Sequence, residues 1–200
     1  MKKVSSRRVS WAVVLVSVLL TAGVFLFFFP QNYPAYTLRI EEKLTAYLDE
    51  VTLPMKLAML SMQEPDKELL MPVYGKSVST VSDTWEAPRD GVRLHEGQDI
   101  FAERGTPVFS ATKGYVRRIR ENSELGGNNV LITGAGGRRY YYAHLDRFAE
   151  GLRVGQEVTT DTVIGFVGNT GNAITTPPHL HFGMYVRRDA LNPFALLRDR

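Results

Sequence analysis

HLHFGMYV at residues 179–186 and RRYYYAHL at residues 138–145 decide the fold class of this 200-residue chain. Both runs are rich in aromatic and apolar side chains and lack a helical period, which is typical of β-strands. Similar runs lie between glycine-containing turns: TPVFSAT at 106–112, GYVRRIR at 114–120, NNVLITG at 128–134 and VIGFVG at 163–168. Many short strands at this spacing predict a mainly β domain over residues 72–200, built as a β-sandwich or a barrel-like sheet.

The histidines all lie in this β domain, although the chain has only four. They are His95 in HEGQD, His144 in YAHL, and His179 and His181 in HLH. Alternate residues of a strand face the same side, so the two imidazoles of HLH lie about 6.5–7 Å apart and can address one centre. Asp99 adds a carboxylate close to His95, and Gly97 between them lets the backbone turn tightly. Together these groups predict a metal site.

Zinc suits this set of ligands. The chain has no cysteine, so a metal must be held by nitrogen or oxygen atoms. Zinc binds histidine nitrogen and aspartate oxygen at about 2.0–2.2 Å, and a catalytic zinc keeps three protein ligands and one open position. Three ligands leave two histidines for general acid and base chemistry. The residues alone leave open which three groups hold the metal.

Each histidine motif also has a structural explanation when it is taken alone. The HLH pair suits the surface of a strand, and HEGQD suits a polar turn. His144, at the end of a tyrosine-rich strand, suits a hydrogen-bonded structural residue. Because every histidine of the chain falls in one small domain, a shared site explains them better than independent placement does.

An apolar segment, WAVVLVSVLLTAGVFLFFF, fills residues 11–29 and holds no charged side chain. As a helix it would match the hydrocarbon core of a bilayer, which is about 30 Å thick. The run is longer than the apolar part of a signal peptide and lacks a clear cleavage site before Pro30. We therefore expect residues 1–30 to form a basic cytoplasmic tail and a transmembrane signal-anchor, with a cleaved signal peptide as the alternative.

The charge of the chain excludes one class of partner. The net charge is +3, but four of the 24 basic residues lie in the first 29 positions, which hold no acidic residue. The rest of the chain therefore carries 20 basic and 21 acidic residues. A nearly neutral body lacks the basic surface of a protein that binds nucleic acid.

Residues 31–71 form the expected connector between the tail and the β domain. Apolar side chains recur there at helical spacing, at Leu44, Tyr47, Leu48 and Val51. We expect this helix to end near Pro54, because proline interrupts a helix. A second apolar run follows at 55–62. The segment is expected to act as a spacer, with a helix that binds a protein partner or a second copy as the alternative.

The histidine motifs, in their order along the chain, resemble those of the lysostaphin-like, or LytM-type, zinc metalloendopeptidases that cut bacterial peptidoglycan. The similar stretches are HEGQDIFAERGTPVFSATKGYV, NNVLITG, YYYAHLDRFAEGLRVGQEV and IGFVGNTGNAITTPPHLHFGMY, which span about residues 83–186. The resemblance implies a duplicated hybrid motif fold for residues 72–200. It also implies that His95, Asp99 and His181 hold one zinc ion per domain, and that His144 and His179 are catalytic.

The resemblance further implies a peptide of the cell wall, either a stem peptide or a cross-bridge, as the substrate. We expect an active endopeptidase with His179 as the general base and His144 as the partner of the oxyanion, although the two roles could be exchanged. It would be anchored by a single span in the bacterial inner membrane, with the β domain on the periplasmic side. The alternatives are a non-catalytic module that activates another wall hydrolase and a zinc hydrolase that acts on something other than the wall.

Overall fold

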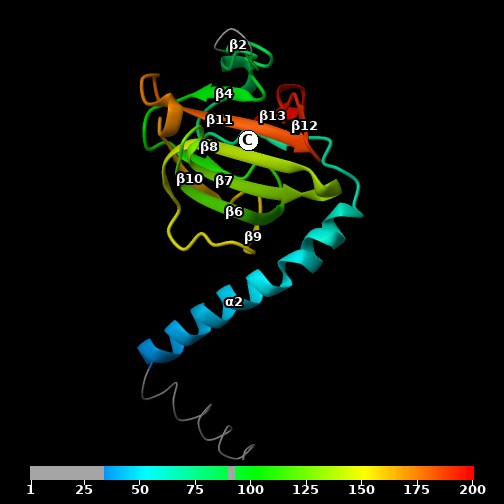
Figure 1. Ribbon diagram of the computed structural model, residues 1–200, viewed down its shortest axis with the longest axis vertical. Helices are drawn as coiled ribbons and strands as arrows, with labels where there is room; N and C mark the ends of the chain where they lie inside the picture. The colour runs from blue at the N-terminus through cyan, green and yellow to red at the C-terminus, as the bar shows by residue number, and fades with distance from the viewer. Residues whose placement is uncertain (1–33, 90–92) are drawn as a thin grey trace, which may run out of the picture. The chain divides into compact units, whose positions relative to one another are not determined.

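The computed structural model of the protein describes residues 34–89 and 93–200 (Figure 1). These residues belong to two compact units, which divide between Thr45 and Ala46. The described part of the first unit is helical, and its apolar side chains Tyr36, Leu38, Ile40 and Leu44 are exposed. The second unit holds the rest of the helix, α2 (Pro34–Ser61), and all of the strands.

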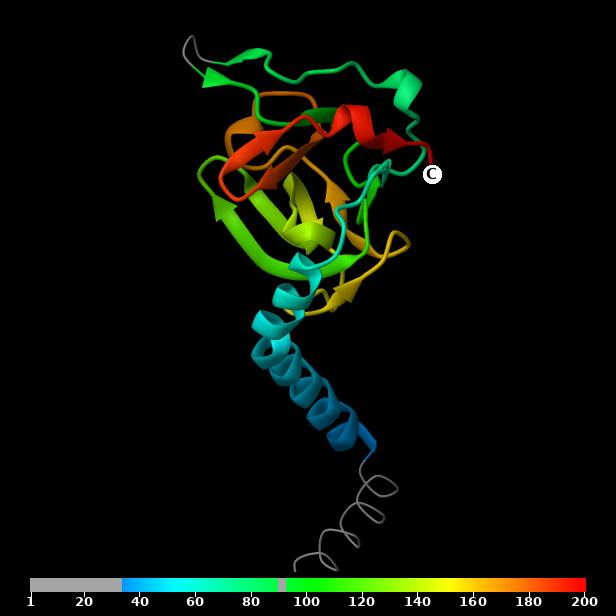
Figure 2. The same cartoon turned by 90° about the vertical axis from the view of Figure 1, so that its right-hand side faces the viewer.

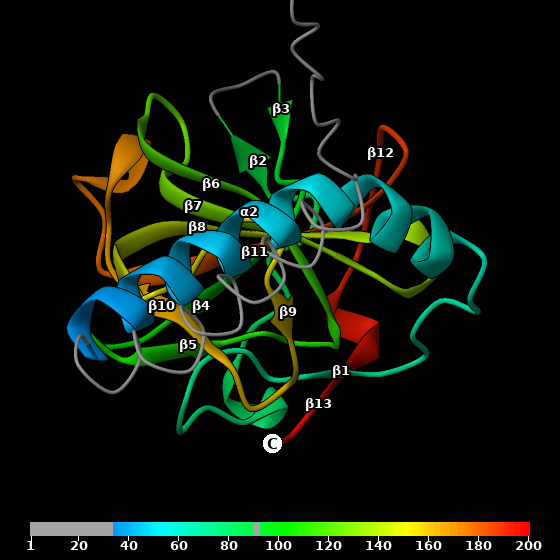
Figure 3. The same cartoon turned by 90° about the horizontal axis from the view of Figure 1, so that it is seen from below.

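The strands confirm that the chain is mainly β. A nine-stranded sheet has the order β12-β11-β8-β7-β6-β9, with β4 paired to β11 and with β10 between β8 and β5. The sheet curls on itself (Figure 2). A second, two-stranded sheet pairs β1 with β13 in parallel (Figure 3), and β2 with β3 forms a hairpin. The strands are β1 (Leu69–Leu70), β2 (Pro88–Arg89), β3 (Arg93–Leu94), β4 (Gln98–Phe101), β5 (Pro107–Phe109), β6 (Gly114–Ser123), β7 (Gly127–Gly134), β8 (Arg139–Phe148), β9 (Glu157–Val158), β10 (Val163–Val167), β11 (His179–Val186), β12 (Asp189–Leu191) and β13 (Leu197–Arg198).

Side chains along the central strands point alternately to a face that packs into the core and to the opposite face, which we call the site face. On β11, Leu180, Phe182 and Met184 are buried in the core, so His179 and His181 lie on the site face. Tyr140 and Tyr142 of β8 and Val130 and Ile132 of β7 join the same core. The strand that carries the HLH motif is thus fixed by its apolar residues, which hold both histidines in place on the opposite side.

The first short strand extends the β domain toward the helix. Leu69 and Met71 are fully buried in the core, and Leu69 pairs with Leu197 of β13. The backbone N–H of Met71 donates to the carbonyl of Arg198 at 2.8 Å. Strand pairing therefore begins ahead of position 72.

The prediction that the connector helix ends near Pro54 is wrong, because α2 continues through Pro54 to Ser61. Proline removes one helical hydrogen bond, but packing can outweigh that loss. Here Leu53 and Leu60 are buried, and the Lys56 ammonium lies 5.2 Å from the ring centroid of Tyr115. These contacts with the β domain hold the last turns of the helix in place.

An ion-pair cluster fastens the same part of α2. Asp49 accepts from Lys56 at 2.8 Å and from the guanidinium of Arg153 at 2.8 Å. Lys56 also donates to the carbonyl of Gly155 at 3.3 Å. A Cβ at Gly155 would collide with the backbone carbonyl of Asp49, and Gly155 has a φ of 82°, so only glycine suits this contact.

No helix within residues 34–89 and 93–200 has both the length and the apolar character needed to cross a membrane. The segment 11–29, for which a transmembrane span is predicted, lies outside the described residues.

Candidate metal centre

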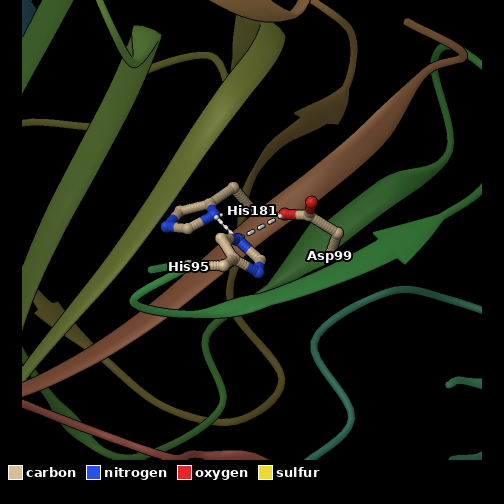
Figure 4. A group of neighbouring side chains, drawn as sticks. All are labelled: His95, Asp99 and His181. Carbon is tan, nitrogen blue, oxygen red and sulfur yellow. Dashed lines mark hydrogen bonds and ion pairs between the residues drawn. The ribbon is translucent and has the colours of Figure 1, made fainter. Parts of the chain in front are cut away.

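Three side chains predicted as metal ligands meet at one point (Figure 4). Nε2 of His95 lies 2.9 Å from Nδ1 of His181, and each of these nitrogens lies 3.1 Å from Oδ1 of Asp99. All three candidate ligand atoms lie within 4.8 Å of one another, and all three residues are wholly or largely buried. The fold thus brings His95 and His181 into contact, although they lie far apart in the sequence.

Strand register brings these residues together. His181 of β11 is the direct partner of Asp99 on β4, so their side chains leave the sheet on the same face. His95 follows β3, and its backbone N–H donates to the carbonyl of Ala87 at 3.0 Å. The short β2–β3 hairpin therefore carries His95 to the ligand pair made by β4 and β11.

Gly97 lies at a bend of the backbone, as the sequence suggests, and it also makes room for a candidate ligand. Its φ is not among the positive values found at other glycines. A Cβ at this position would lie 2.5 Å from Cε1 and 2.8 Å from Nε2 of His181. Gly97 leaves the space that the ring of His181 occupies.

Thr84 holds two of the three candidate ligands, and the sequence analysis missed it. Its carbonyl accepts the Nδ1–H of His95 at 2.7 Å, which leaves the lone pair of Nε2 directed at the shared point. Its hydroxyl accepts the backbone N–H of Asp99 at 2.9 Å. Arg89 of β2, also missed, is ion-paired with Oδ2 of Asp99. No motif marks either residue, because each acts through a contact that only the fold creates.

The charge states of the cluster suit a divalent metal. Burial raises the pKa of Asp99, but the neighbouring imidazoles of His181 and His95 outweigh it and hold that pKa well below its usual range. Burial lowers the pKa of His181, so its imidazole is neutral near pH 7. A charged carboxylate and neutral imidazoles are the forms in which these side chains bind a metal.

Two nitrogens and one carboxylate oxygen are the donors of a three-ligand zinc site. No fourth His, Cys, Asp or Glu joins this group among the described residues. The residues therefore fit a zinc ion that keeps an open coordination position.

The other two histidines lie beside this centre. The ring of His144 is 5.0 Å from that of His179 and 5.9 Å from that of His181, between centroids. His179 donates from Nδ1 to the carbonyl of Pro177, and His144 donates from Nδ1 to the carbonyl of Thr170, each at 2.9 Å. In the neutral form of either ring, this hydrogen bond places the proton on Nδ1 and leaves Nε2 unprotonated. Nε2 of His179 lies 3.9 Å from Oδ1 of Asp99.

A β-bulge brings His144 to this position. Strict alternation after Tyr140 and Tyr142 would place His144 in the core. Instead, three steps from Tyr142 to Leu145 on β8 match two steps on β7, and His144 has a φ of 62°. Leu145 then takes the core position and His144 lies with the metal cluster. Such a bulge re-aims one side chain, and its left-handed backbone is costly for a residue other than glycine.

The sequence model of peptidase family M23 matches residues 93–193, just over half of the chain. An L-Ala–D-Glu endopeptidase of Bacillus subtilis is 42% identical over 109 residues, which cover 51% of this chain and 33% of that protein. The DD-carboxypeptidase/endopeptidase Mpg of Neisseria meningitidis is 36% identical over 125 residues, which cover 62% of this chain and 26% of that protein.

The solved catalytic domain of the antimicrobial peptidase lysostaphin from Staphylococcus simulans is similar at 29% identity with a TM-score of 0.50. The match covers 58% of this chain and 91% of that domain. In the two curated relatives above, the matched region is a third or less of the whole protein.

Proposed function

Because the chain belongs to peptidase family M23, we propose that it is a zinc endopeptidase that hydrolyses peptide bonds of bacterial peptidoglycan. The observation that carries the proposal is the completeness of the site: three candidate ligands converge, and two more histidines present free Nε2 atoms beside them. The relatives are named as an L-Ala–D-Glu endopeptidase and a DD-carboxypeptidase/endopeptidase, and peptide bonds that involve D-amino acids support the choice of a peptidoglycan peptide as substrate.

His95, Asp99 and His181 would hold the zinc ion. When bound, zinc supplies a Lewis acid that polarises a carbonyl oxygen and makes water more acidic. The protein has to keep one base free next to that ion, and an imidazole with an unprotonated Nε2 can take a proton there.

We assign the general base to His179, because its Nε2 lies 3.9 Å from Oδ1 of Asp99 and so borders the ligands directly. After it has taken a proton, the same atom can donate that proton to the departing amine. His144 cannot donate from Nε2 while its ring is neutral, because its single proton lies on Nδ1, bonded to Thr170. In the resting state we therefore assign His144 a hydrogen bond that it accepts from the substrate or from water, in place of the oxyanion contact that the sequence suggests.

We also propose that residues 1–30 anchor the enzyme in the bacterial inner membrane as a single-pass protein. The uncharged segment 11–29 and the basic residues ahead of it support this topology. It places the β domain on the periplasmic side, where peptidoglycan is found.

The experiment is to incubate the purified full-length chain with peptidoglycan sacculi and to analyse the released fragments by mass spectrometry. Release that a chelator abolishes and added zinc restores is the expected result, and the fragment masses identify the bond that is cut. If no sacculus type releases fragments although the chain holds zinc, the endopeptidase proposal is wrong. A test for stimulation of a second wall hydrolase would then follow.

A further inference from the structure

Two arginines of β6 lie on the same face of the sheet as the candidate metal centre. Arg118 pairs with Leu131 of β7, and Arg120 pairs with Asn129. Between them, Ile119 pairs with Val130 and packs against the core. Since successive residues of a strand face opposite sides, Arg118 and Arg120 point to the site face.

The ladder continues from these arginines to the metal cluster. Leu131 pairs with Tyr141 of β8, which pairs in turn with Gly183 of β11, two residues from His181. Figure 1 shows β6, β7, β8, β11 and β4 side by side in this order. The site face therefore has the candidate ligands at one side and the arginines at the other.

Tyr141 connects the two sides. Its ring meets the ring of His181 edge to face, at 6.1 Å between centroids. Its hydroxyl lies within the electrostatic influence of Arg118 and Arg120, which oppose the rise in the pKa of Tyr141 that burial causes. One tyrosine side chain thus separates the arginines from a candidate metal ligand.

The arginines lack the partners that such groups normally have. Among the described residues, neither Arg118 nor Arg120 forms an ion pair, and the same holds for Arg139 of β8, whose guanidinium lies 6.0 Å from the ring centroid of Tyr185. Nε of Arg118 is buried without a hydrogen bond, as is Oδ1 of the fully buried Asn129. Burial and the nearby Arg120 lower the pKa of Arg118.

A carboxylate is the group that these arginines are best suited to bind. Guanidinium groups bind carboxylates through paired, charge-assisted hydrogen bonds, and an anion also relieves the repulsion between neighbouring arginines. This combination matches a peptide with a free carboxylate more closely than it matches a neutral chain.

We propose that Arg118, Arg120 and Arg139 form a subsite for a free carboxylate of the peptide substrate, so that the enzyme selects anionic stem peptides over neutral cross-bridges such as oligoglycine. The inference rests on the proposed function and adds the substrate class to it. Three strand intervals of about 4.8 Å separate β6 from β11, and an extended peptide covers that span in about four residues. The carboxylate would therefore lie within about four residues of the bond that is cut.

The test compares two synthetic stem tetrapeptides, one with free carboxylates and one with carboxamides in their place, and uses pentaglycine amide as the neutral reference. Binding to the full-length chain is measured by calorimetry in the presence of a chelator, so that no turnover occurs. We expect the carboxylate peptide to bind at least about tenfold more tightly than the other two, as charge-assisted hydrogen bonds would give.

Arg118→Gln and Arg120→Gln should each remove most of this preference and leave the weak binding of the carboxamide peptide unchanged. The matched control is Arg188→Gln, which removes the same charge in the exposed turn between β11 and β12 and should keep the preference. With zinc, the two site variants should raise KM for the carboxylate peptide and leave kcat unchanged, and Arg120→Lys should restore part of the loss.

Equal binding of the carboxylate and carboxamide peptides by the unaltered chain would overturn the proposal. So would an equal loss with Arg188→Gln, or a loss that is the same for both peptides. If Arg118→Gln does not fold, Arg120→Gln decides alone, because Arg120 is exposed. Since the binding assay needs no catalysis, a selective carboxylate site would be detected even if the sacculi are not cut.

Discussion

Replacement of Gly97 by alanine tests how tightly the fold holds His181 in the metal centre. The added Cβ would lie 2.5 Å from Cε1 of His181, whereas ordinary contact begins at 3.4 Å, so the ring must move by about 0.9 Å. Cε1 is bonded to Nδ1, the atom that faces Asp99 and His95. Metal–ligand distances tolerate only about 0.2 Å, so a shift of this size removes His181 as a ligand.

We expect Gly97→Ala to lower zinc affinity by more than about 100-fold. Loss of a hydrogen-bond partner of a ligand costs up to about 100-fold in affinity, and this substitution displaces a ligand itself. Overpacking should lower the free energy of unfolding by about 1–3 kcal/mol. Zinc affinity is measured by competition with a chromogenic chelator, and stability by urea denaturation of the metal-free chain.

The matched control is Gly105→Ala. Its Cβ would meet nothing within 4 Å, but its φ of 86° makes the substitution strained, at a cost of about 1–2 kcal/mol. The two variants should thus lose similar stability, while only Gly97→Ala loses zinc. If Gly97→Ala binds zinc as tightly as the control does, the contact with His181 does not position the ligand and the reasoning fails.

Three further substitutions test other parts of the structure. Burial raises the pKa of Asp49, but Lys56 and Arg153 outweigh this effect and lower that pKa below 3.8. The ionised carboxylate therefore stabilises the fold above pH 3.8, and this stabilisation is lost as the pH falls through the pKa of the folded state. The Tm of Asp49→Asn should therefore lie below that of the unaltered chain at pH 6 and approach it below about pH 4; a gap that is constant with pH would contradict this. Tyr142→Phe leaves the buried N–H of Ala111, now bonded at 2.9 Å, without an acceptor and should cost about 1–3 kcal/mol in urea denaturation; no loss would show that another acceptor replaces it. Thr84→Val removes the hydroxyl that holds Asp99 and should weaken zinc binding by about 10-fold or more, and unchanged affinity would show that the hydroxyl is dispensable.

The sequence predicts those features of this fold that depend on local patterns. Strand β11 begins with histidine and apolar residues in alternation, so its core face and its site face follow from the amino-acid pattern alone. The tyrosine-rich run likewise predicts β8. The polar strand β4 carries no comparable pattern, because Gln98 and Asp99 are buried through partners on other segments rather than through apolar character.

The features that sequence analysis misses are those that long-range contacts decide. The sequence places His144 among the site residues, but the bulge that brings it there shows in the sequence at most as the three-residue spacing of Tyr142 and Leu145. The helix passes Pro54 because the β domain packs against the turns around it. The position of Arg118 beside the site depends on the order of four strands, which no short motif reports.

The most direct test of the account compares zinc content and cleavage of sacculi in His179→Ala and His181→Ala. The account assigns His181 to the metal and His179 to proton transfer. His179→Ala should therefore retain one zinc ion per chain and lose cleavage, whereas His181→Ala should lose both. Equal zinc retention in the two variants, or cleavage that survives in His179→Ala, would contradict the assignment of roles at this site.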